Sequence, residues 1–314
     1  MGRRHDGYTA ALVVATVIWG ASTVVSKRAV DEVAPLTLLP IQLLVSVTTL
    51  AVTMAIGGSR PWARHTPRVR RLALLGVLNP GLAYALSLIG LTQITASLSV
   101  LIWAAQPVMI LIFAVVILRE RIAAATGWCT AVALCGVGLV VFEPSSGATT
   151  LGIVLTLLAV VAGSLFTVLS TRHLVDVPIR DVVLAQQSVA LVLAIVVAGA
   201  SWVLDEVPDL GAVSAVGWIS TASGGVLSYA LASSLYVHGL SGVSADYAAV
   251  FVNLIPVFGV GAGFVALHER LEPRQWLGGA LIVAAVAAVT RFRIVQSRGQ
   301  LTVRGETNLT ASGT

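Results

Sequence analysis

The sequence predicts an all-α integral membrane protein whose ten transmembrane helices form two inverted five-helix repeats. Its composition is 57% hydrophobic and 11% charged, with a mean hydropathy of +0.94, whereas soluble domains carry about 25% charged residues. Ten apolar segments approach the length of about 20 residues that a helix needs to cross the hydrocarbon core. The two halves of the chain also match at a constant spacing of 149 residues. Because each half holds five segments, an odd number, the second half must enter the bilayer inverted.

The repeat is clearest around two prolines in the middle of apolar segments. Four stretches align without a gap, namely Gly90-Leu91 with Gly239-Leu240, Ala96 with Ala245, Pro107-Val108 with Pro256-Val257, and Glu120-Arg121 with Glu269-Arg270. Apolar segments agree at Ala, Leu and Val through composition alone, but prolines and Glu-Arg pairs in one register are not expected by chance. The chain therefore contains an internal duplication of about 150 residues.

The segments divide the chain into two domains and a tail. We expect the first repeat in residues 1–145, the second, inverted repeat in residues 146–293, and a disordered, polar cytoplasmic tail in residues 294–314. The predicted helices are 8–26, 36–56, 72–89, 96–118 and 123–142 in the first repeat, and 151–171, 182–204, 213–237, 244–267 and 276–290 in the second. The first segment is not a cleaved signal peptide, because Lys27-Arg28 follows it without a small-residue cleavage site.

Positive charges indicate the orientation of these helices. With the N-terminus inside, 15 of the 19 Lys and Arg residues fall on the inner segments. The outer segments hold only Lys27, Arg28, Arg270 and Arg274. The positive-inside rule therefore predicts a multi-pass protein of the plasma (inner) membrane with both termini in the cytoplasm.

Several stretches resemble a known family. The first segment carries WGASTVVSKRAV, the fourth and ninth carry QPV and IPV and end in LRER and LHER, and the glycine-bearing GWCTAVALCGVGLV and QWLGGALIVAAVAAV follow them. In these motifs and in segment count, the chain resembles EamA-type ten-helix members of the drug/metabolite transporter superfamily. The resemblance implies a secondary transporter of small metabolites, amino acids or drugs that works without ATP. It also implies export by alternating access through a central cavity between the repeats.

Polar side chains at mid-depth in the apolar segments form the predicted substrate path. Such groups are costly in a bilayer unless they are paired or hydrated. Several recur at helical spacing and so share one face, as do Tyr229, Ser233 and Tyr236. The alternative is that they only join helices through hydrogen bonds. The predicted path residues are Trp19, Ser22, Tyr84, Ser87, Trp103, Gln106, Tyr229, Ser233, Tyr236 and Asn253.

Pro107 and Pro256 are predicted helix kinks. A proline inside a helix removes one backbone hydrogen bond, and a membrane tolerates this only where protein or water satisfies the freed carbonyl. The kinks act either as hinges of the path or as static bends that shape packing. Two structural ion pairs are predicted at the segment ends, Glu120 with Arg121 and Glu269 with Arg270.

Asp246 is the one acid that we place within an apolar segment, and its counterpart in the first repeat is Ser97. Burial favours the neutral form of a carboxyl group, so Asp246 is a candidate for proton coupling. His238, eight residues earlier across a short turn, is positioned to share that proton. Alternatively, Asp246 caps the first turn of its helix, where the dipole stabilises an anion. The sequence leaves both roles open.

Other functions lack their motifs. Lys27 is the only lysine and does not end a phosphate-binding loop, and His268-Glu269 does not continue into the zinc motif His-Glu-x-x-His. Basic residues flank apolar segments instead of forming a patch with aromatic residues, so nucleic acid is not expected. We expect no enzyme activity, no metal and no cofactor, and as partners a small-molecule substrate, the lipid bilayer and protons, with a homodimer left open. The alternatives are a polytopic membrane enzyme and a non-transporting receptor or scaffold.

Overall fold

The computed structural model of the chain describes residues 2–60, 66–118, 124–141, 148–171, 178–204, 208–240, 251, 254–285 and 287–288, and these contain helices and no strands. Helices cover the described parts of all ten predicted segments. By length and composition, 6 of the described helices are able to cross a membrane. Two shorter apolar helices are Gly127–Val140 and Ile255–Leu267. The predicted tail, 294–314, lies outside the described residues.

In the described residues the helices of the two halves follow a similar order, although the counterpart of α5, residues 245–252, lies outside them except for Phe251. The first half consists of α1 (Gly2–Val30), α2 (Pro35–Ile56), a helix divided into α3 (Pro67–Leu74), η1 (Leu75–Val77), η2 (Leu78–Leu82) and α4 (Ala83–Leu91), then α5 (Ala96–Trp103), α6 (Gln106–Leu118) and α7 (Ala124–Val141). The second half consists of α8 (Thr150–Thr171), α9 (Ile179–Leu204), the short η3 (Leu210–Ala212), a helix divided into α10 (Ala215–Gly224), η4 (Gly225–Ala232) and α11 (Ser233–Leu240), then α13 (Ile255–Leu267) and a helix over 273–285.

Short hydroxyl side chains begin several of these helices. Thr66 accepts a hydrogen bond from the Val69 amide (3.3 Å) and so caps α3. Thr95 caps α5 and Ser214 caps α10 in the same way, at 3.1 and 3.0 Å. A hydroxyl at this position satisfies an amide that has no partner inside the helix. These caps set where the chain turns back into the bundle.

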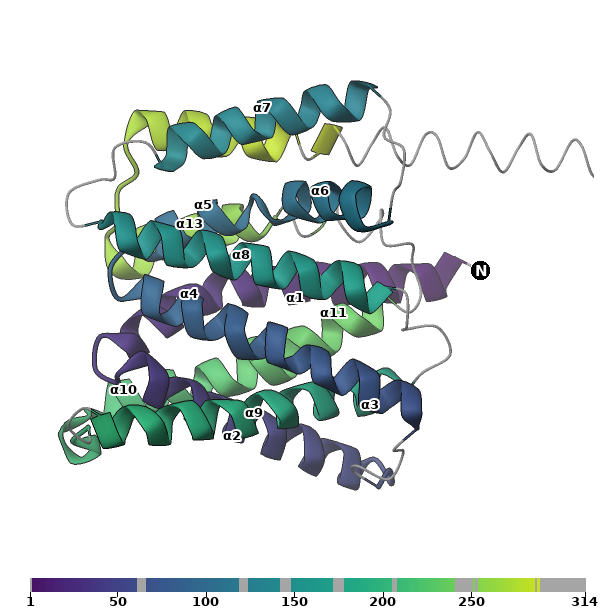
Figure 1. Ribbon diagram of the computed structural model, residues 1–314, viewed down its shortest axis with the longest axis vertical. Helices are drawn as coiled ribbons and strands as arrows, with labels where there is room; N and C mark the ends of the chain where they lie inside the picture. Colours follow the sequence, from purple (N-terminus) through teal and green to yellow (C-terminus); the bar gives the residue numbers. More distant parts are fainter. Residues whose placement is uncertain are drawn as a thin grey trace, which may run out of the picture.

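The helices pack side by side in one bundle (Figure 1). α7 and the helix over 273–285 lie on one side of the bundle, α2 and α9 lie on the opposite side, and α1, α4, α8 and α11 lie between them. Glycines permit a close approach of α7 to its neighbour. A Cβ atom on Gly136 would lie 2.8 Å from the Gly278 carbonyl oxygen, and one on Gly278 would lie 2.7 Å from that of Gly136. Such small-residue contacts are typical of helices packed in membranes.

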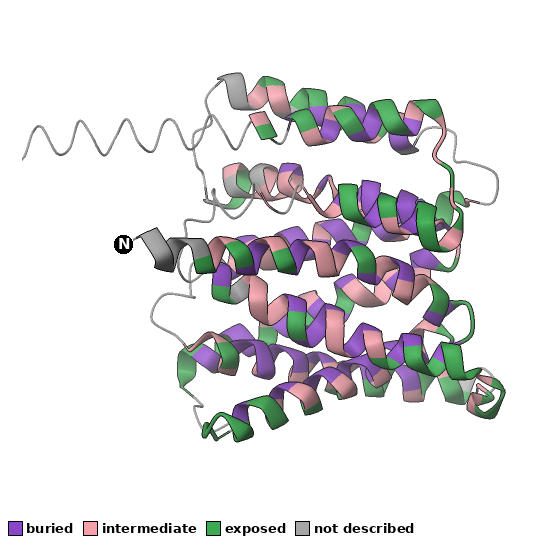
Figure 2. Ribbon diagram, turned by 180° about the vertical axis from the view of Figure 1, so that it is seen from behind, coloured by how far each residue is buried: buried purple, intermediate pink, exposed green. Residues whose placement is uncertain are grey.

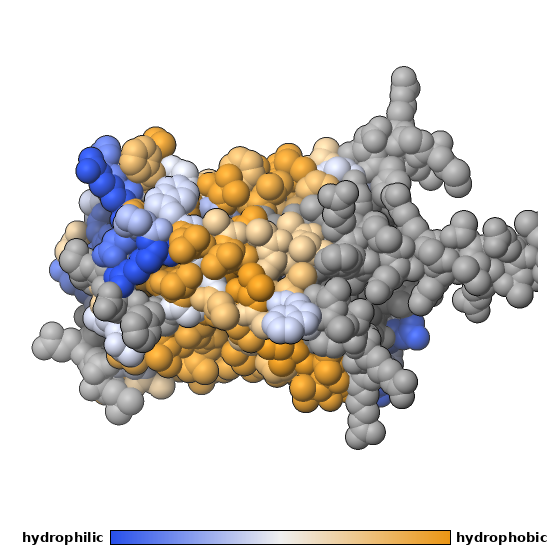
Figure 3. Space-filling model, turned by 90° about the horizontal axis from the view of Figure 1, so that it is seen from above, coloured by the Kyte–Doolittle hydropathy of each residue, from blue (hydrophilic) through white to orange (hydrophobic). Residues whose placement is uncertain are grey.

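Large apolar side chains cover the outside of the bundle. Val203 is 85% exposed, Val265 is 74% exposed and Ile219 is 66% exposed. Figure 2 shows exposed residues along the outer faces of the helices, with buried residues inside. In Figure 3, hydrophobic residues extend across the middle of one face, and hydrophilic residues gather at one end. Because soluble proteins rarely expose such wide apolar surfaces, this belt is suited to the lipid bilayer.

The two predicted kinks lie at equivalent places. α5 ends at Trp103, a turn follows, and α6 begins with Gln106 and Pro107. In the second half, α13 begins with Ile255 and Pro256. Proline is tolerated in the first turn of a helix because the amide that it lacks would have no helical partner there. Both prolines therefore begin a new helix after a break, and a hinge motion at these breaks stays a prediction.

The third helix of each half departs from a regular α-helix at an equivalent place. η2 (Leu78–Leu82) is a kink, because Asn79 within it has non-helical backbone angles (φ −147°, ψ 121°), whereas η4 (Gly225–Ala232) is a π-helical stretch. Moved along the chain by the repeat spacing of 149 residues, η2 falls on 227–231, which lies inside η4. A π turn changes which amide each carbonyl pairs with, and such stretches are frequent at functional sites. The backbone is thus irregular at equivalent positions of the two halves, as a kink in one and a π-helical stretch in the other.

Candidate functional site

Two tyrosines join the third helices of the two halves. Tyr84 lies on α4 directly after η2, and Tyr229 lies within η4. Their ring centroids are 4.6 Å apart at an interplanar angle of 42°. Tyr229 is 2% exposed, whereas Tyr84 is half-buried. Tilted aromatic pairs at this separation are favourable beyond the area that they bury. Two phenol groups therefore lie between the two halves of the bundle.

Trp19 of α1 contacts the helix that carries Tyr229. Its indole N–H donates a hydrogen bond of 3.0 Å to the Ser228 carbonyl in η4. The Ser233 hydroxyl donates to that carbonyl as well, at 3.3 Å. The ring of Tyr236 lies 5.0 Å from that of Trp19, between centroids. The π-helical stretch thus offers a carbonyl to two side chains that the sequence places on the path.

A second cluster of polar side chains lies where helices of the first half contact α8. The Trp103 indole N–H donates to the Ser87 hydroxyl at 3.2 Å. The Gln106 carbonyl accepts a hydrogen bond of 3.3 Å from Ser164 of α8. A Cβ atom on Gly163 would lie 3.2 Å from the Trp103 ring and 3.4 Å from the Gln106 Nε2 atom. Glycine at this position therefore lets α8 pack directly against both side chains.

The two groups are continuous along α4. Tyr84 and Ser87 are three residues apart and so occupy one face of that helix. The structure therefore connects eight of the ten predicted path residues, namely Trp19, Tyr84, Ser87, Trp103, Gln106, Tyr229, Ser233 and Tyr236. Ser22 is buried and donates to the Ile18 carbonyl of its own helix at 2.5 Å. Asn253 lies outside the described residues.

Buried amides on α2 and α9 extend this polar interior, and our sequence analysis did not select them. The Gln187 amide donates to the Tyr229 carbonyl at 2.7 Å, and its oxygen accepts from Ser46. Gln42 is fully buried, and neither polar atom of its side chain has a hydrogen-bond partner in the described part of the chain. Gln42 and Gln187, like Gln106, lie in apolar helices. The criterion that selected Gln106, an amide within an apolar segment, would therefore also have found Gln42 and Gln187.

Cationic side chains cap helix C-termini at one end of the bundle. Lys27 donates to the Leu91 carbonyl at the end of α4 (2.9 Å) and pairs with Asp31 (3.2 Å). Arg28 donates to the Ala266 carbonyl near the end of α13 at 2.9 Å. The last carbonyls of a helix have no helical partners and carry partial negative charge, so cations are favourable there.

Anionic side chains cap helix N-termini at the same end. Glu32 accepts hydrogen bonds from the Ser214 amide (2.7 Å) and hydroxyl (2.8 Å) at the start of α10. Glu269 accepts from the amides of Ala96 and Ser97, both at 2.8 Å, at the start of α5. The end of the bundle that contains Lys27, Arg28, Glu32 and Glu269 is called the capped end below.

The contacts of Glu269 differ from the predicted ion pair with Arg270. Among the described residues, the ion pairs are Lys27 with Asp31 and Arg274 with Glu272, and none joins Glu269 to Arg270. The carboxylate is better placed on two free amides of α5, because a charge-assisted hydrogen bond to a helix N-terminus is stronger than an exposed pair. The other predicted pair, Glu120 with Arg121, lies outside the described residues.

Of Asp246 and His238, the two residues predicted to share a proton, the structure describes only His238. Asp246 lies outside the described residues. His238 lies near the end of α11 and is exposed, and its ring centroid is 5.1 Å from that of Tyr8 on α1. His238 lies at the end of the bundle opposite the capped end. Tyr8, its neighbour, is near the start of α1, whereas Lys27 and Arg28 of the capped end are near the end of that helix (Figure 1).

Comparison with known proteins identifies a family and similar proteins. The sequence profile of the EamA-like transporter family matches twice, over residues 7–142 and 150–291. A protein of Archaeoglobus fulgidus described as an uncharacterized transporter is 24% identical over 293 residues, which cover 90% of this chain and 98% of the relative. A solved structure titled only as the crystal structure of a protein aligns with a TM-score of 0.65 at 17% identity, over 91% of this chain and 97% of its own.

Proposed function

Since the chain belongs to the EamA-like transporter family, we propose that it is a secondary transporter that exports a small organic solute across the plasma (inner) membrane without ATP. One observation carries the proposal. The line of polar and aromatic side chains from Trp19 to Gln106 runs between the two halves, inside a bundle whose outer surface is apolar. Most members of this line keep partial exposure, as expected where a solute or water reaches them.

Ten membrane-spanning helices in two inverted repeats, residues 1–145 and 146–293, form the proposed architecture. Its support is that helices at equivalent positions of the halves make equivalent contacts. α1 packs against α13, and α8 packs against α5 and α6. α2 packs against η4, and α9 packs against η1 and η2. An approximate two-fold axis in the membrane plane relates such pairs in transporters built from inverted repeats.

Both termini are cytoplasmic in this arrangement, and the capped end faces outward. Its support is the distribution of positive charge, because Lys27 and Arg28 belong to the few cationic residues of the outer segments. A reporter fused at Ser146 is then outside, and one fused at Ser241 is inside. A reporter at Ser241 that is active outside the cell contradicts the inverted repeat.

Alternating access is the proposed mechanism. At the capped end, Lys27 and Arg28 of α1 and Glu32 just beyond it contact the ends of α4, α13 and α10, so we expect this end to be the closed one. Opening it requires these contacts to separate while the opposite end closes. The breaks before Pro107 and Pro256, the kink at η2 and the π-helical stretch η4 are the places where we expect the helices to bend, because irregular backbone absorbs such motion at low cost.

Proton coupling through Asp246 is part of the proposal. Its support is the sequence alone, because ionisable residues within membrane segments are often functional. Uptake of a proton by Asp246 would neutralise a charge in the apolar interior and so lower the cost of moving the helices that surround it.

The function is tested with purified protein in detergent. A thermal-shift screen against amino acids, nucleosides, sugars and cationic drugs identifies ligands that stabilise the folded protein. Each stabilising ligand is then recovered and analysed chemically, and its flux is measured in proteoliposomes without ATP. We expect an unchanged ligand that crosses the membrane. A chemically altered ligand would identify an enzyme, and a bound ligand without flux would identify a receptor.

A further inference from the structure

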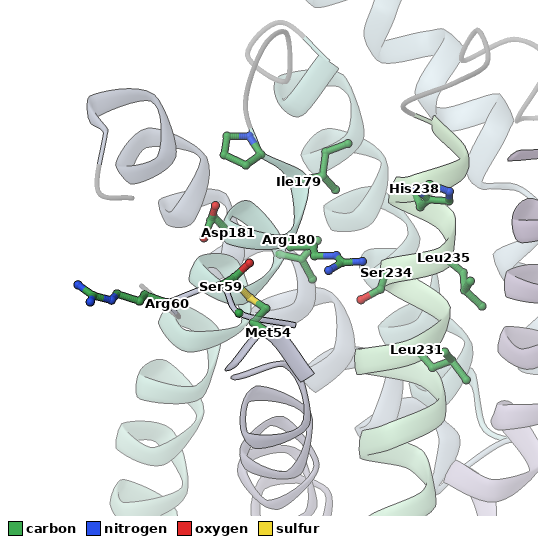
Figure 4. Close-up of a pocket in the computed structure, with 13 residues that line it drawn as sticks. Met54, Ser59, Arg60, Ile179, Arg180, Asp181, Leu231, Ser234, Leu235 and His238 are labelled. Atoms are coloured by element: carbon green, nitrogen blue, oxygen red, sulfur yellow. The ribbon is translucent and has the colours of Figure 1, made fainter. Parts of the chain in front are cut away.

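A cavity of about 740 Å³ lies at the end of the bundle opposite the capped end. It is formed where α2 ends, α9 begins, and η4 passes into α11 (Figure 4). Its lining does not include the aromatic line between the repeats, and of the predicted functional residues it includes only His238. A cavity of this size accommodates a small organic molecule or the head and upper chain of a lipid.

The lining has two chemical parts. One part is apolar and consists of Met54, Ile179, Val183, Leu231 and Leu235. The other part is polar, with the cations Arg60 and Arg180, the hydroxyls of Ser59 and Ser234, His238 and a single carboxylate, Asp181. A ligand that fits both parts has an apolar body and an anionic group.

Arg180 is the residue that most favours an anion. In the described part of the chain its guanidinium has no carboxylate within ion-pair distance, although Asp181 is its neighbour in sequence. Figure 4 shows the Arg180 guanidinium directed toward Ser234 and His238, whereas Asp181 lies apart from them. Arg180 also belongs to the first turn of α9, where the helix dipole is unfavourable for a cation. A bound anion would offset this unfavourable placement.

We propose that this cavity binds an amphipathic organic phosphate, with its phosphate group on Arg180 and Ser234 and its apolar body against Leu231, Leu235 and Met54. The planar guanidinium is suited to phosphate because it donates two parallel hydrogen bonds. The shared chemistry is found in phospholipid headgroups and in soluble organic phosphates. This binding does not depend on transport, since it would also occur in a protein that moves no solute.

The test uses the full chain purified in uncharged detergent, with dihexanoylphosphatidic acid as the probe and calorimetric titration as the measurement. Arg180→Gln should weaken binding about tenfold or more, because it removes a charge-assisted contact. Leu231→Trp should weaken binding by filling the apolar part without any change of charge. Arg71→Gln is the matched control, because Arg71 is an exposed arginine of α3 that does not line the cavity.

Two further titrations distinguish the sources of the ligand. Displacement of the probe by inorganic phosphate at a similar concentration would support the proposal and assign the site to soluble phosphates. Resistance to inorganic phosphate, together with loss of copurifying anionic phospholipid in Arg180→Gln, would support it and assign the site to lipid. Equal affinity of wild type and Arg180→Gln for the probe, or equal affinity for the probe and for dihexanoylglycerol, which lacks the phosphate group, would overturn the proposal. None of these outcomes depends on flux, so the result is independent of the proposed transport.

Discussion

The ring of Tyr84 on the third helix of the first half lies 4.6 Å from the ring of Tyr229 on the third helix of the second half. Tyr84 follows the kink at η2 and Tyr229 lies in the π-helical stretch η4, and the repeat spacing relates these two irregular stretches. Trp19 and Gln187 donate hydrogen bonds to neighbouring carbonyls of η4, those of Ser228 and Tyr229. Polar and aromatic side chains therefore meet between the two halves, and the predictions below concern this place and the helix ends of the bundle.

Trp19→Phe tests the path at α1. The substitution keeps an aromatic ring beside Tyr236 and removes the N–H that donates to Ser228. We expect stability to fall by the value of one neutral hydrogen bond, about 0.5–1.5 kcal/mol. Flux should fall about tenfold or more, because small misplacements of positioning groups have large kinetic effects. Measurements of thermal unfolding and proteoliposome flux separate these two effects.

Trp202→Phe is the matched control for this variant. The Trp202 indole N–H also donates a hydrogen bond of 3.0 Å, to the Thr37 hydroxyl, but it lies away from the aromatic line. It should show a similar loss of stability with nearly unchanged flux. A similar loss of flux in both variants would mean that Trp19 has only a structural role.

Glu269→Ala tests the capped end. The substitution leaves the amides of Ala96 and Ser97 at the start of α5 without their acceptor. We expect the free energy of unfolding to fall by about 1.5–3 kcal/mol, the range for hydrogen bonds to a charged group. Glu272→Ala is the control, because it removes only the carboxylate that pairs with Arg274 at the surface, which is worth about 0–1 kcal/mol. Equal effects on thermal unfolding would contradict the capping role.

Pro107→Ala and Pro256→Ala test the helix breaks. Each proline stands in the first turn of its helix, where alanine also fits, so the folded yield should change little. We expect flux to fall more than folded yield in both variants, because a continuous helix across the break would resist bending. Parallel losses of yield and flux would show that the breaks only shape packing.

Asp246→Asn tests proton coupling. The amide cannot take up a proton, but it keeps the size of the side chain and can still accept a hydrogen bond at a helix N-terminus. We expect the stabilisation by a ligand to persist, and flux driven by a pH gradient to be lost. Gradient-driven flux at the wild-type rate would leave Asp246 with the role of a helix cap.

The all-helical class and the approximate positions of the apolar helices followed from the sequence because hydrophobic segment length is a local property. Among the described residues, each predicted segment contains helix. The contacts between side chains distant in the sequence could not be predicted from it. Glu269 was assigned to its neighbour Arg270, but its carboxylate lies on amides that are more than 170 residues away in the chain.

The structure brings most of the predicted path residues together, but their arrangement was not predicted. A regular helix places Tyr229, Ser233 and Tyr236 on one face, but Tyr229 lies in the π-helical η4 and contacts Tyr84, whereas Tyr236 contacts Trp19. The apolar pattern of the sequence gave no indication of this π turn, whose carbonyls accept hydrogen bonds from Trp19 and Gln187 on other helices. Gln42 and Gln187 were missed, although they meet the criterion that selected Gln106.

The central claim is that a path between the two repeats opens alternately to each side of the membrane. It is tested with Ser233→Cys in a chain that also carries Cys129→Ser and Cys135→Ser, the substitutions that remove both free cysteines. Ser233 is half-buried on the line of polar and aromatic residues, whereas Val196→Cys, 63% exposed on the apolar surface of α9, is the lipid-facing control. In sealed membranes, a membrane-impermeant maleimide should label the Ser233→Cys variant when it is added on either side, and a stabilising ligand should slow both reactions. Labelling of this variant from neither side, as expected for the lipid-facing control, or from one side under all conditions, would contradict the account.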